Sequence, residues 1–372
     1  MARTIIGVND ARAVKRYSGN LALDTSAKSY GSSRFMARGA EAEVPVQILT
    51  ELESDAGEEI KYDLLAEMTM APVEGDDTLE NKEEKQKLYT DSIYIDQARC
   101  GVNTGGRMTR KRTLHNLREK AKRQQSNWWA RFHDEMLFMY GAGSRGINAN
   151  FLVSTSFTGR ANNSLVAPDS NHIVYGGNAT AFNNIDSADT LTLGTITSAM
   201  TRATVQGGGV SGIPVMQPCK IDGEEVFIFV MHTWQEDDLR KSTTTGDWMD
   251  LQKAAAASTG LKSHLFSKNL GMHRGVILHS NKNVIRFNTA GSGANVEAAR
   301  GLFMGSQAMV CAYGSPGTNM RFDWNEEPRD NNNQVVITSA AILGCKKVTY
   351  TTEEAGAQDF GMFAIDTACA TR

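Results

Sequence analysis

Two short segments near the start of the chain alternate apolar and polar residues. In the first, Ile60, Tyr62 and Leu64 share one side, with charged residues between them, and a second alternating run covers residues 92–96. A period of two is typical of a strand with one buried face. The turn-rich acidic segment 72–77 lies between them, so we expect a long two-stranded arm with a charged tip. An isolated hairpin is marginal in water, so this arm needs a surface, from its own domain or from a neighbouring subunit.

A helical apolar stripe of period three to four runs through residues 107–140, which contain neither Pro nor Gly. This predicts one helix of roughly 50 Å at 1.5 Å per residue. The Trp128–Trp129 pair and the nearby Arg131 suggest base stacking, but inside such a periodic helix we interpret Trp128 as a core residue. The stripe consists of Leu114, Leu117, Ala121, Trp128, Phe132, Met136 and Met139.

The remaining pattern predicts a mixed α+β protein. Residues 1–45 are rich in Gly, Ser and Ala without a period, which predicts an extended arm that is ordered only when something binds it. The Asn- and Ser-rich residues 146–190 predict loops of an inserted surface segment. We expect helices over 191–206, 233–240 and 247–257, strands over 226–231, 275–278, 284–287, 335–343, 347–350 and 360–365, and another apolar element over 298–311.

The formal net charge of −3 conceals blocks of opposite sign. The first forty residues and residues 99–131 are basic, whereas residues 51–96 are heavily acidic. For any single charge, a solvated surface position is the simpler interpretation. Segregation into blocks, however, suits a subunit that meets copies of itself in a fixed orientation.

Length and composition fit an ordinary folded protein. The chain has 372 residues, of which 41% are hydrophobic and 22% charged. No apolar run approaches the length of a membrane span, and no signal peptide is visible, so we expect synthesis in the cytoplasm and no membrane partner. The five cysteines form no CxxC pair, which favours small buried hydrophobes over zinc or disulfide chemistry.

Motifs for catalysis or metal binding are weak. Residues 141–146 match GxGxxG, but they follow a helix where a nucleotide fingerprint follows a strand, so we interpret them as a helix end. His133, Asp134 and Glu135 lie on the long helix without an identifiable further ligand, which favours packing over a metal site. The acidic run 74–84 lacks the alternating pattern of a calcium loop. We expect no cofactor, no metal and no enzyme activity, although carboxylate pairs formed only in space would escape this search.

Four segments resemble one large family of tailed-bacteriophage major capsid proteins, common among short-tailed phages. Residues 58–65, 72–75 and 92–99 resemble its E-loop, and residues 128–138 resemble the end of its spine helix. Residues 300–314, with ArgGlyLeuPheMetGlySerGlnAla leading to AlaTyrGly, are similar to a further family stretch. Residues 344–347 and 359–366 resemble the closing segment, whereas residues 151–190 match least well.

The resemblance implies the α+β capsid fold, divided into an N-terminal arm (1–50), an E-loop hairpin (51–100), a spine helix (101–145) and the insertion (146–190). An axial domain (191–320) and the returning strands of a peripheral domain (321–372) complete it. The implied function is self-assembly into hexamers and pentamers of an icosahedral head around dsDNA. The implied partners are other copies, a scaffolding protein, a portal and a decoration or cement protein, in the virion capsid.

Two residue sets follow as hypotheses. The acidic tip would meet basic groups of another subunit through Glu74, Asp76, Asp77, Glu80, Glu83 and Glu84. The arm would face packaged DNA or contact other arms through Arg3, Arg12, Lys15 and Arg16. The alternatives are an encapsulin-like compartment subunit, an enzyme without a recognisable motif, and a nucleic-acid-binding protein; the last is disfavoured by the negative net charge.

Overall fold

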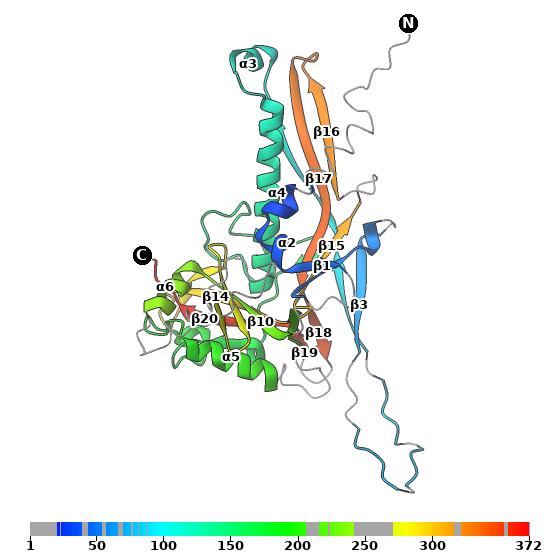
Figure 1. Ribbon diagram of the computed structural model, residues 1–372, viewed down its shortest axis with the longest axis vertical. Helices are drawn as coiled ribbons and strands as arrows, with labels where there is room; N and C mark the ends of the chain where they lie inside the picture. Colours follow the sequence, from blue (N-terminus) through cyan, green and yellow to red (C-terminus); the bar gives the residue numbers. More distant parts are fainter. Residues whose placement is uncertain are drawn as a thin grey trace.

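The computed structural model describes residues 21–22, 24–38, 44–53, 57–65, 70–75, 77–80, 82–86, 88–205, 216–221, 224–241, 271–315, 321–352 and 356–371. The molecule is elongated, and parts of the chain project from its body at both ends of the long axis (Figure 1). Among the described residues, no helix is both long and apolar enough to cross a membrane.

Strands outnumber helices, which confirms the mixed α+β prediction. The helices are α2 (Tyr30–Arg34), α3 (Arg107–Arg112), α4 (Leu117–Ala142), α5 (Leu193–Val205) and α6 (Thr233–Lys241). The strands are β1 (Met36–Arg38), β2 (Val46–Leu49), β3 (Glu59–Leu65), β4 (Leu88–Tyr94), β5 (Asp96–Asn103), β6 (Gly159–Arg160), β7 (Asn163–Ser164), β8 (Ile173–Tyr175), β9 (Cys219–Ile221), β10 (Glu224–Met231), β11 (Gly271–His273), β12 (Val276–Ser280), β13 (Arg286–Ala290), β14 (Val296–Met304), β15 (Met309–Gly314), β16 (Phe322–Arg329), β17 (Gln334–Lys347), β18 (Thr349–Thr352), β19 (Gly356–Asp359) and β20 (Met362–Ala368).

A six-stranded sheet forms the long axis of the molecule. Its order is β1-β2-β15-β17-β16, and β5 also pairs with β17. The 14-residue strand β17 organises this sheet because it pairs with β16 and β15 along successive parts of its length. The strand predicted over 335–343 lies within β17, which continues to Lys347, and the end of the strand predicted over 347–350 belongs to the separate strand β18.

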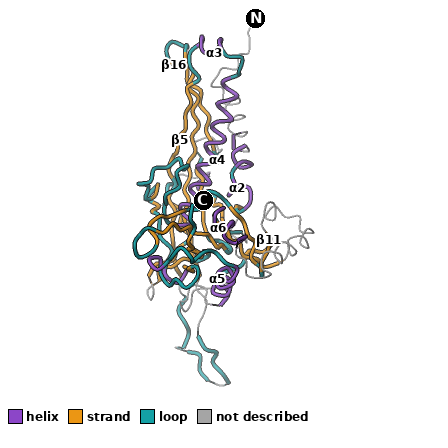
Figure 2. Tube along the Cα trace, turned by 90° about the vertical axis from the view of Figure 1, so that its left-hand side faces the viewer, coloured by secondary structure: helices purple, strands orange, loops and turns teal. Residues whose placement is uncertain are grey.

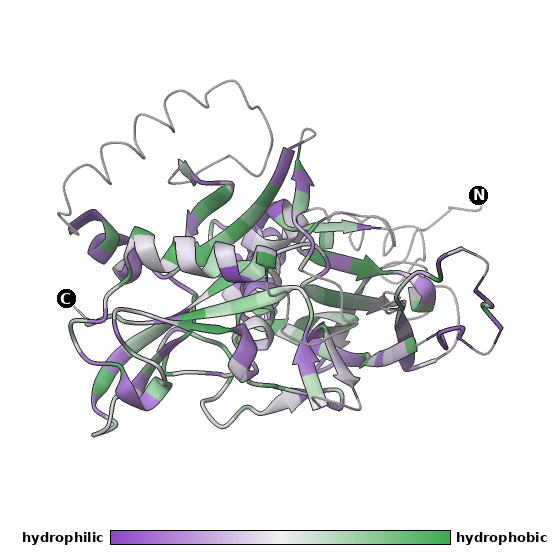
Figure 3. Cartoon of the chain, turned by 90° about the horizontal axis from the view of Figure 1, so that it is seen from below, coloured by the Kyte–Doolittle hydropathy of each residue, from purple (hydrophilic) through white to green (hydrophobic). Residues whose placement is uncertain are grey.

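An eight-stranded sheet lies beside it, in the order β11-β12-β10-β14-β20-β8, with β13 on β14 and β9 on β10. The predicted apolar element 298–311 is divided between the two sheets, since β14 belongs to this one and β15 to the other. The last strand, β20, pairs with β14 rather than with β16 or β17. Apolar residues gather on the strands in the interior (Figure 3).

The long helix is shorter than the pattern predicts. Residues 107–140 form α3 and α4 rather than one helix, because Thr113 has an extended backbone and Asn116 caps α4 by accepting a hydrogen bond from the Arg118 backbone N–H. At 1.5 Å per residue, the 26 residues of α4 span about 39 Å. Leu114, assigned to the apolar stripe, lies between the helices and is fully exposed. α4 runs alongside the six-stranded sheet in both views (Figures 1 and 2).

The helix ends at glycines that the sequence marks. Gly143 caps α4 with φ +65°, the left-handed region in which glycine is favoured. A Cβ added at this position would lie 2.0 Å from the Val166 carbonyl oxygen, so no other residue fits without a shift. The interpretation of residues 141–146 as a helix end is therefore confirmed.

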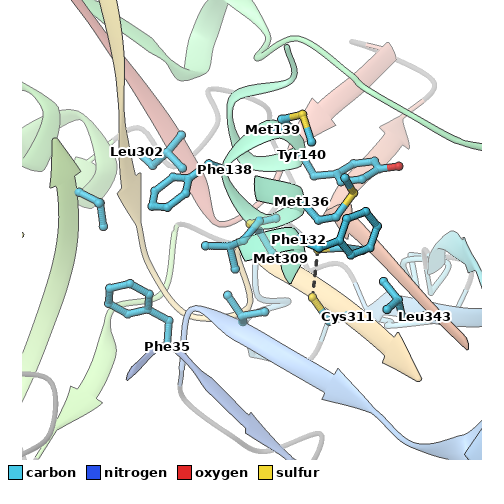
Figure 4. Packing of buried hydrophobic residues seen from close by; sticks show 14 of the residues in the cluster. Phe35, Phe132, Met136, Phe138, Met139, Tyr140, Leu302, Met309, Cys311 and Leu343 are labelled. Carbon is cyan, nitrogen blue, oxygen red and sulfur yellow. Dashed lines mark hydrogen bonds between the residues drawn. The ribbon is translucent and has the colours of Figure 1, made fainter. Parts of the chain in front are cut away.

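The core forms where α4 passes between the two sheets. Its buried residues include Phe132, Met136, Phe138, Met139 and Tyr140, which lie near Leu302 of β14 and Met309 of β15 (Figure 4). Trp129 is fully buried and donates to the Ser339 hydroxyl at 2.8 Å, whereas Trp128 is half-buried. Trp129, rather than the predicted Trp128, is therefore the fully buried tryptophan of the core.

Four of the five cysteines are buried and the fifth, Cys100, is half-buried, and all are free thiols. Cys311 and Cys345 face each other across β15 and β17, with their Sγ atoms 3.0 Å apart. This agrees with their interpretation as small buried residues.

Part of the N-terminal segment is folded against its own chain, so the prediction of an arm ordered only by a partner was wrong for its described residues. Asp134 of α4 accepts hydrogen bonds from the Ser29 hydroxyl (2.8 Å) and from the Tyr30 and Gly31 backbone N–H groups (3.0 and 2.9 Å). Phe35 is fully buried, and β2 pairs in parallel with β15. A buried carboxylate and one large aromatic residue fix a segment whose composition suggests disorder.

A bidentate ion pair joins the eight-stranded sheet to the end of α4. Arg300 of β14 donates to both Asp366 oxygens of β20, at 2.8 and 2.7 Å, and to the Ala142 carbonyl at 2.9 Å. Both side chains are buried, and every one of these contacts satisfies a charge that burial would otherwise destabilise.

The loops of residues 146–190 pack closely on the body. They contain the short strands β6, β7 and β8, of which β8 pairs with β20. The Asn163 side chain accepts from the Tyr94 N–H at 3.0 Å and donates to the Tyr94 carbonyl at 2.7 Å, as a neighbouring strand would. Helices α5 and α6 confirm the helices predicted over 191–206 and 233–240, and β10 confirms the buried strand predicted over 226–231. The helix predicted over 247–257 lies outside the described residues.

Candidate assembly surfaces

The predicted two-stranded arm is present as the β3–β4 hairpin. Its antiparallel register pairs Ile60 with Ile93, and both side chains are buried against the body. The partners of these two residues include Val310 and Ala312 of β15 and Tyr350 of β18. The base of the hairpin therefore has an apolar support within its own chain.

A polar contact also anchors the hairpin base. Lys346 of β17 forms an ion pair with Asp91 of β4, and the Tyr62 hydroxyl donates to the same carboxylate at 2.7 Å. Burial raises the pKa of Tyr62, and the negative charge of Asp91 raises it further, so the phenol remains protonated and keeps donating. The hairpin base is thus held to the body by apolar packing and by the Lys346–Asp91 ion pair.

Beyond the base, the hairpin continues into a long loop that projects from the body (Figure 1). We call residues 70–75, 77–80 and 82–86 the tip; none of them forms helix or strand. Glu74, Asp77, Glu80 and Glu83 are exposed there, as is Leu79, half of whose surface is accessible. The predicted acidic residues therefore share one projecting loop, except that Asp76 lies outside the described residues.

Contacts between its own residues give the tip some internal structure. Half-buried Glu84 accepts a hydrogen bond from the Met70 backbone N–H at 2.8 Å, which ties the two legs of the loop together. Asp77 forms an exposed ion pair with Lys82 at 3.7 Å. An exposed pair contributes little to stability.

Basic residues cluster at the other end of the long axis, on α3 and the first turns of α4 (Figures 1 and 2). We call residues 107–123 the basic end. Two of its cations are paired within the chain: Arg118 with buried Glu326 at 2.7 Å, and Lys122 with Asp24 at 3.5 Å. The full set is Arg107, Arg110, Lys111, Arg112, Arg118, Lys120, Lys122 and Arg123.

A surface groove of about 650 Å³, the spine groove, opens at the basic end between α3, the start of α4, β16 and β17. Its lining includes the cations Arg107, Arg110 and Arg118, the carboxylate Glu326 and the apolar residues Leu117 and Val335. The sequence predicts the basic block but not the groove, because β16 and β17 lie more than two hundred positions later in the chain. Arg107 and Asn333, which are joined by a hydrogen bond, are 226 residues apart in the sequence.

The polar triplet on α4 serves packing. Asp134 binds the N-terminal segment, and Glu135 accepts from the Leu152 N–H at 2.7 Å. The His133 ring stacks on Phe322 at 6.1 Å, and burial, with the charge of Arg321 adding to it, lowers the pKa of His133 to about 4. Within the described residues, no group of three or more His, Cys, Asp or Glu is placed to hold a metal ion.

The basic residues predicted to face DNA or other arms, Arg3, Arg12, Lys15 and Arg16, lie outside the described residues. The sequence does not predict the contacts of Asp134; the available signal is the polar triplet of His133, Asp134 and Glu135 within an otherwise apolar part of α4. It likewise does not predict the Arg300–Asp366 pair, although both residues lie in segments quoted above for the family resemblance.

Comparison with known proteins agrees with this architecture. Residues 5–371 match the phage capsid protein family. The major capsid protein of Pseudomonas phage KPP25 is 26% identical over 356 residues, which cover 89% of each chain.

Solved capsids have the same fold. The capsid of Ralstonia phage GP4 superposes with a TM-score of 0.85 at 41% identity, over 100% of this chain and 99% of that one. The capsid of cyanophage Pam1 has a TM-score of 0.68 at 18% identity, over 90% and 91% of the two chains, which is a likeness of fold. The chain therefore belongs to the phage capsid protein family: it is a major capsid protein of a phage head.

Proposed function

We propose that this chain assembles with copies of itself into hexamers and pentamers of an icosahedral head that encloses dsDNA. Its role is structural rather than catalytic. We also propose that the chain is synthesised in the host cytoplasm. Its further partners in assembly are a scaffolding protein, a portal and a decoration or cement protein. The capsids of phages GP4 and Pam1 support it by their likeness.

The observation that carries the proposal is the placement of opposite charges at opposite ends of one subunit. The acidic tip projects from one end and the basic end lies at the other (Figure 1). A subunit of this kind attracts a second copy in a head-to-tail orientation, and such contacts form closed rings when the rotation closes.

We also propose a division of the chain into domains. We assign residues 1–50 to the N-terminal arm, 51–100 to the E-loop, 101–145 to the spine, 191–320 to the axial domain and 321–372 to the peripheral domain, with the insertion at 146–190. The pairing of β20 with β14 supports a closer tie between the last two parts than this division implies.

We further propose that Arg3, Arg12, Lys15 and Arg16 face the packaged DNA. Contacts to phosphates release counterions, so binding by these residues weakens steeply with salt. DNA affinity of the chain that is insensitive to salt would contradict this, and would favour contacts between arms.

Expression of the chain, alone and with its scaffolding protein, tests the main proposal. Sedimentation and negative-stain electron microscopy are expected to show closed shells, or rings of six and five subunits. A folded monomer or small dimer under both conditions would overturn it.

A further inference from the structure

Two of the five cysteines face each other across neighbouring strands of the six-stranded sheet. Cys311 of β15 and Cys345 of β17 are directly opposite in the antiparallel register, and their Sγ atoms lie 3.0 Å apart. Directly opposed residues of an antiparallel pair have Cα atoms about 4.5–5.5 Å apart, and a disulfide bridges Cα atoms about 4.4–6.8 Å apart. The backbone therefore needs no rearrangement to join these two residues.

The sheets align the remaining cysteines differently. Cys100 of β5 lies opposite a serine, and Cys219 of β9 lies opposite a valine. Cys369 follows the last strand. Cys311 and Cys345 are thus the two thiols that a strand register brings together.

A small crevice leads to one thiol of the pair. Cys345 lines it together with Tyr140 of α4, Asn163 of β7 and Gly344 of β17, and its volume is about 10 Å³. A volume of this size holds about one molecule of the size of water. Hydrogen peroxide is an oxidant close to that size, so the crevice favours a hydroperoxide over a bulky disulfide reagent.

We propose that Cys311 and Cys345 form a modification site that a hydroperoxide converts into a disulfide between β15 and β17. The Cys345 thiolate attacks one peroxide oxygen, so an S–O bond forms, the O–O bond breaks, and the departing hydroxide takes up the thiol proton as water. The Cys311 sulfur then attacks the sulfenic sulfur, so the S–S bond forms, the S–O bond breaks, and the second oxygen leaves as water with the Cys311 proton. The two sulfurs supply the two electrons that reduce the peroxide, and no other reactant is needed.

The reaction is expected to be slow. The hydrogen bond with Cys311, together with burial, raises the pKa of Cys345 well above its usual range, so little of the reactive thiolate is present at neutral pH. A slow reaction suits a lasting link rather than a rapid signal. A reducing cytosol keeps such a pair open, whereas disulfides persist at virion surfaces and outside cells.

The disulfide joins β17 to the strand that receives the N-terminal segment. β15 pairs with β2 on its other side, and both cysteines belong to the core beside α4, where Cys311 lies with Phe132 and Met136 (Figure 4). The bond closes a loop whose ends are 34 positions apart. Closure of a loop restricts the unfolded chain and thereby stabilises the folded one.

A count of free thiols in the folded chain tests the site. The chain is purified with reductant, freed of it, and then either treated with hydrogen peroxide or left untreated. It is next unfolded in excess N-ethylmaleimide and analysed by mass spectrometry. The untreated chain is expected to carry five labels and the treated chain three, with a peptide pair linked through Cys311 and Cys345. Reduction of the treated chain before labelling restores all five.

Two variants sharpen the count. Cys311→Ala removes the second thiol of the pair, so peroxide is expected to produce no linked peptides. Cys100→Ala, the matched control, also removes one cysteine and is expected to keep the link between Cys311 and Cys345. Absence of that link in the treated unsubstituted chain, whether its thiols stay free or another pair joins, would overturn the proposal. This result does not depend on the folding of either variant.

Urea unfolding gives a second readout. The linked chain is expected to have an unfolding equilibrium constant about a hundredfold lower than that of the reduced chain. Peroxide treatment of Cys311→Ala is expected to produce no such change. Equal unfolding curves for the linked and reduced chains would overturn the stabilising role of the bond. The proposal does not rest on self-assembly, so neither result bears on the assembly function.

Discussion

The molecule contains two long antiparallel hairpins, and they are supported differently. The β16–β17 hairpin lies along α4, where Gln125 donates to the Ile337 carbonyl at 2.9 Å and Trp129 donates to Ser339. The β3–β4 hairpin is held at its base, and most of the described residues of its tip are exposed. The β16–β17 hairpin is therefore supported within its own chain, whereas the β3–β4 hairpin presents a surface that a neighbour can cover.

Removal of the main support of the β16–β17 hairpin should have the largest effect. Trp129→Ala leaves a cavity in the core and removes the hydrogen bond to Ser339, so we expect a loss of about 3–5 kcal/mol in the free energy of unfolding. Urea unfolding of the unassembled subunit, followed by circular dichroism, measures it. Half-buried Trp128→Ala is the control, and an equal loss in both variants would contradict the assignment.

Acid should weaken the body through buried histidines. Burial, assisted by nearby arginines, lowers the pKa of both His133 and His232 to about 4, below the usual value near 6.5. Between these values the unfolded chain binds more protons, so stability is complete above about pH 6.5 and falls toward pH 4, at up to about 1.4 kcal/mol per pH unit for each histidine.

Unfolding free energies measured across that pH range test the acid effect. His133→Gln cannot titrate at this position, so its slope against pH is expected to be smaller by up to about 1.4 kcal/mol per pH unit. A slope identical to that of the wild type would show that His133 does not contribute.

The base of the β3–β4 hairpin should respond to loss of its ion pair. Lys346→Met leaves the Asp91 carboxylate without its cation, and we expect a local loss of about 1–3 kcal/mol. Hydrogen exchange of the β3 and β4 amides measures it. Arg329→Met, which removes an exposed pair with Glu327, is the control and should change stability by less than about 0.5 kcal/mol. Equal effects of the two changes would argue against anchoring by Lys346.

The tip should contribute least to the stability of a single subunit. Leu79→Ala removes an exposed side chain, so the free energy of unfolding should change by less than about 0.5 kcal/mol, while shell yield falls. Leu152→Ala, on an exposed loop, should change neither quantity. A clear loss of subunit stability with Leu79→Ala would mean that the tip packs on its own chain.

Local patterns were sufficient to predict the elements but not their partners. Alternation identified the β3–β4 hairpin, and helical periodicity identified α4, because both signals lie within a few neighbouring residues. The start of α4 depends on one cap, Asn116, which the apolar stripe obscured, and Leu114 lies before it, outside the core.

Contacts between distant segments were out of reach. The burial of Phe35, the Asp134 contacts at a separation of 103 residues or more and the spine groove each need two segments to meet in space. The order of elements and the family resemblance indicated assembly, whereas the spine groove required the fold.

Hydrogen exchange of the tip, compared between free subunits and assembled shells, tests the central claim most directly. We predict fast exchange of the described amides between residues 70 and 86 in free subunits and strong protection of the same amides in shells. Exchange at the tip that is equally fast in shells would contradict the claim that a neighbouring copy covers it.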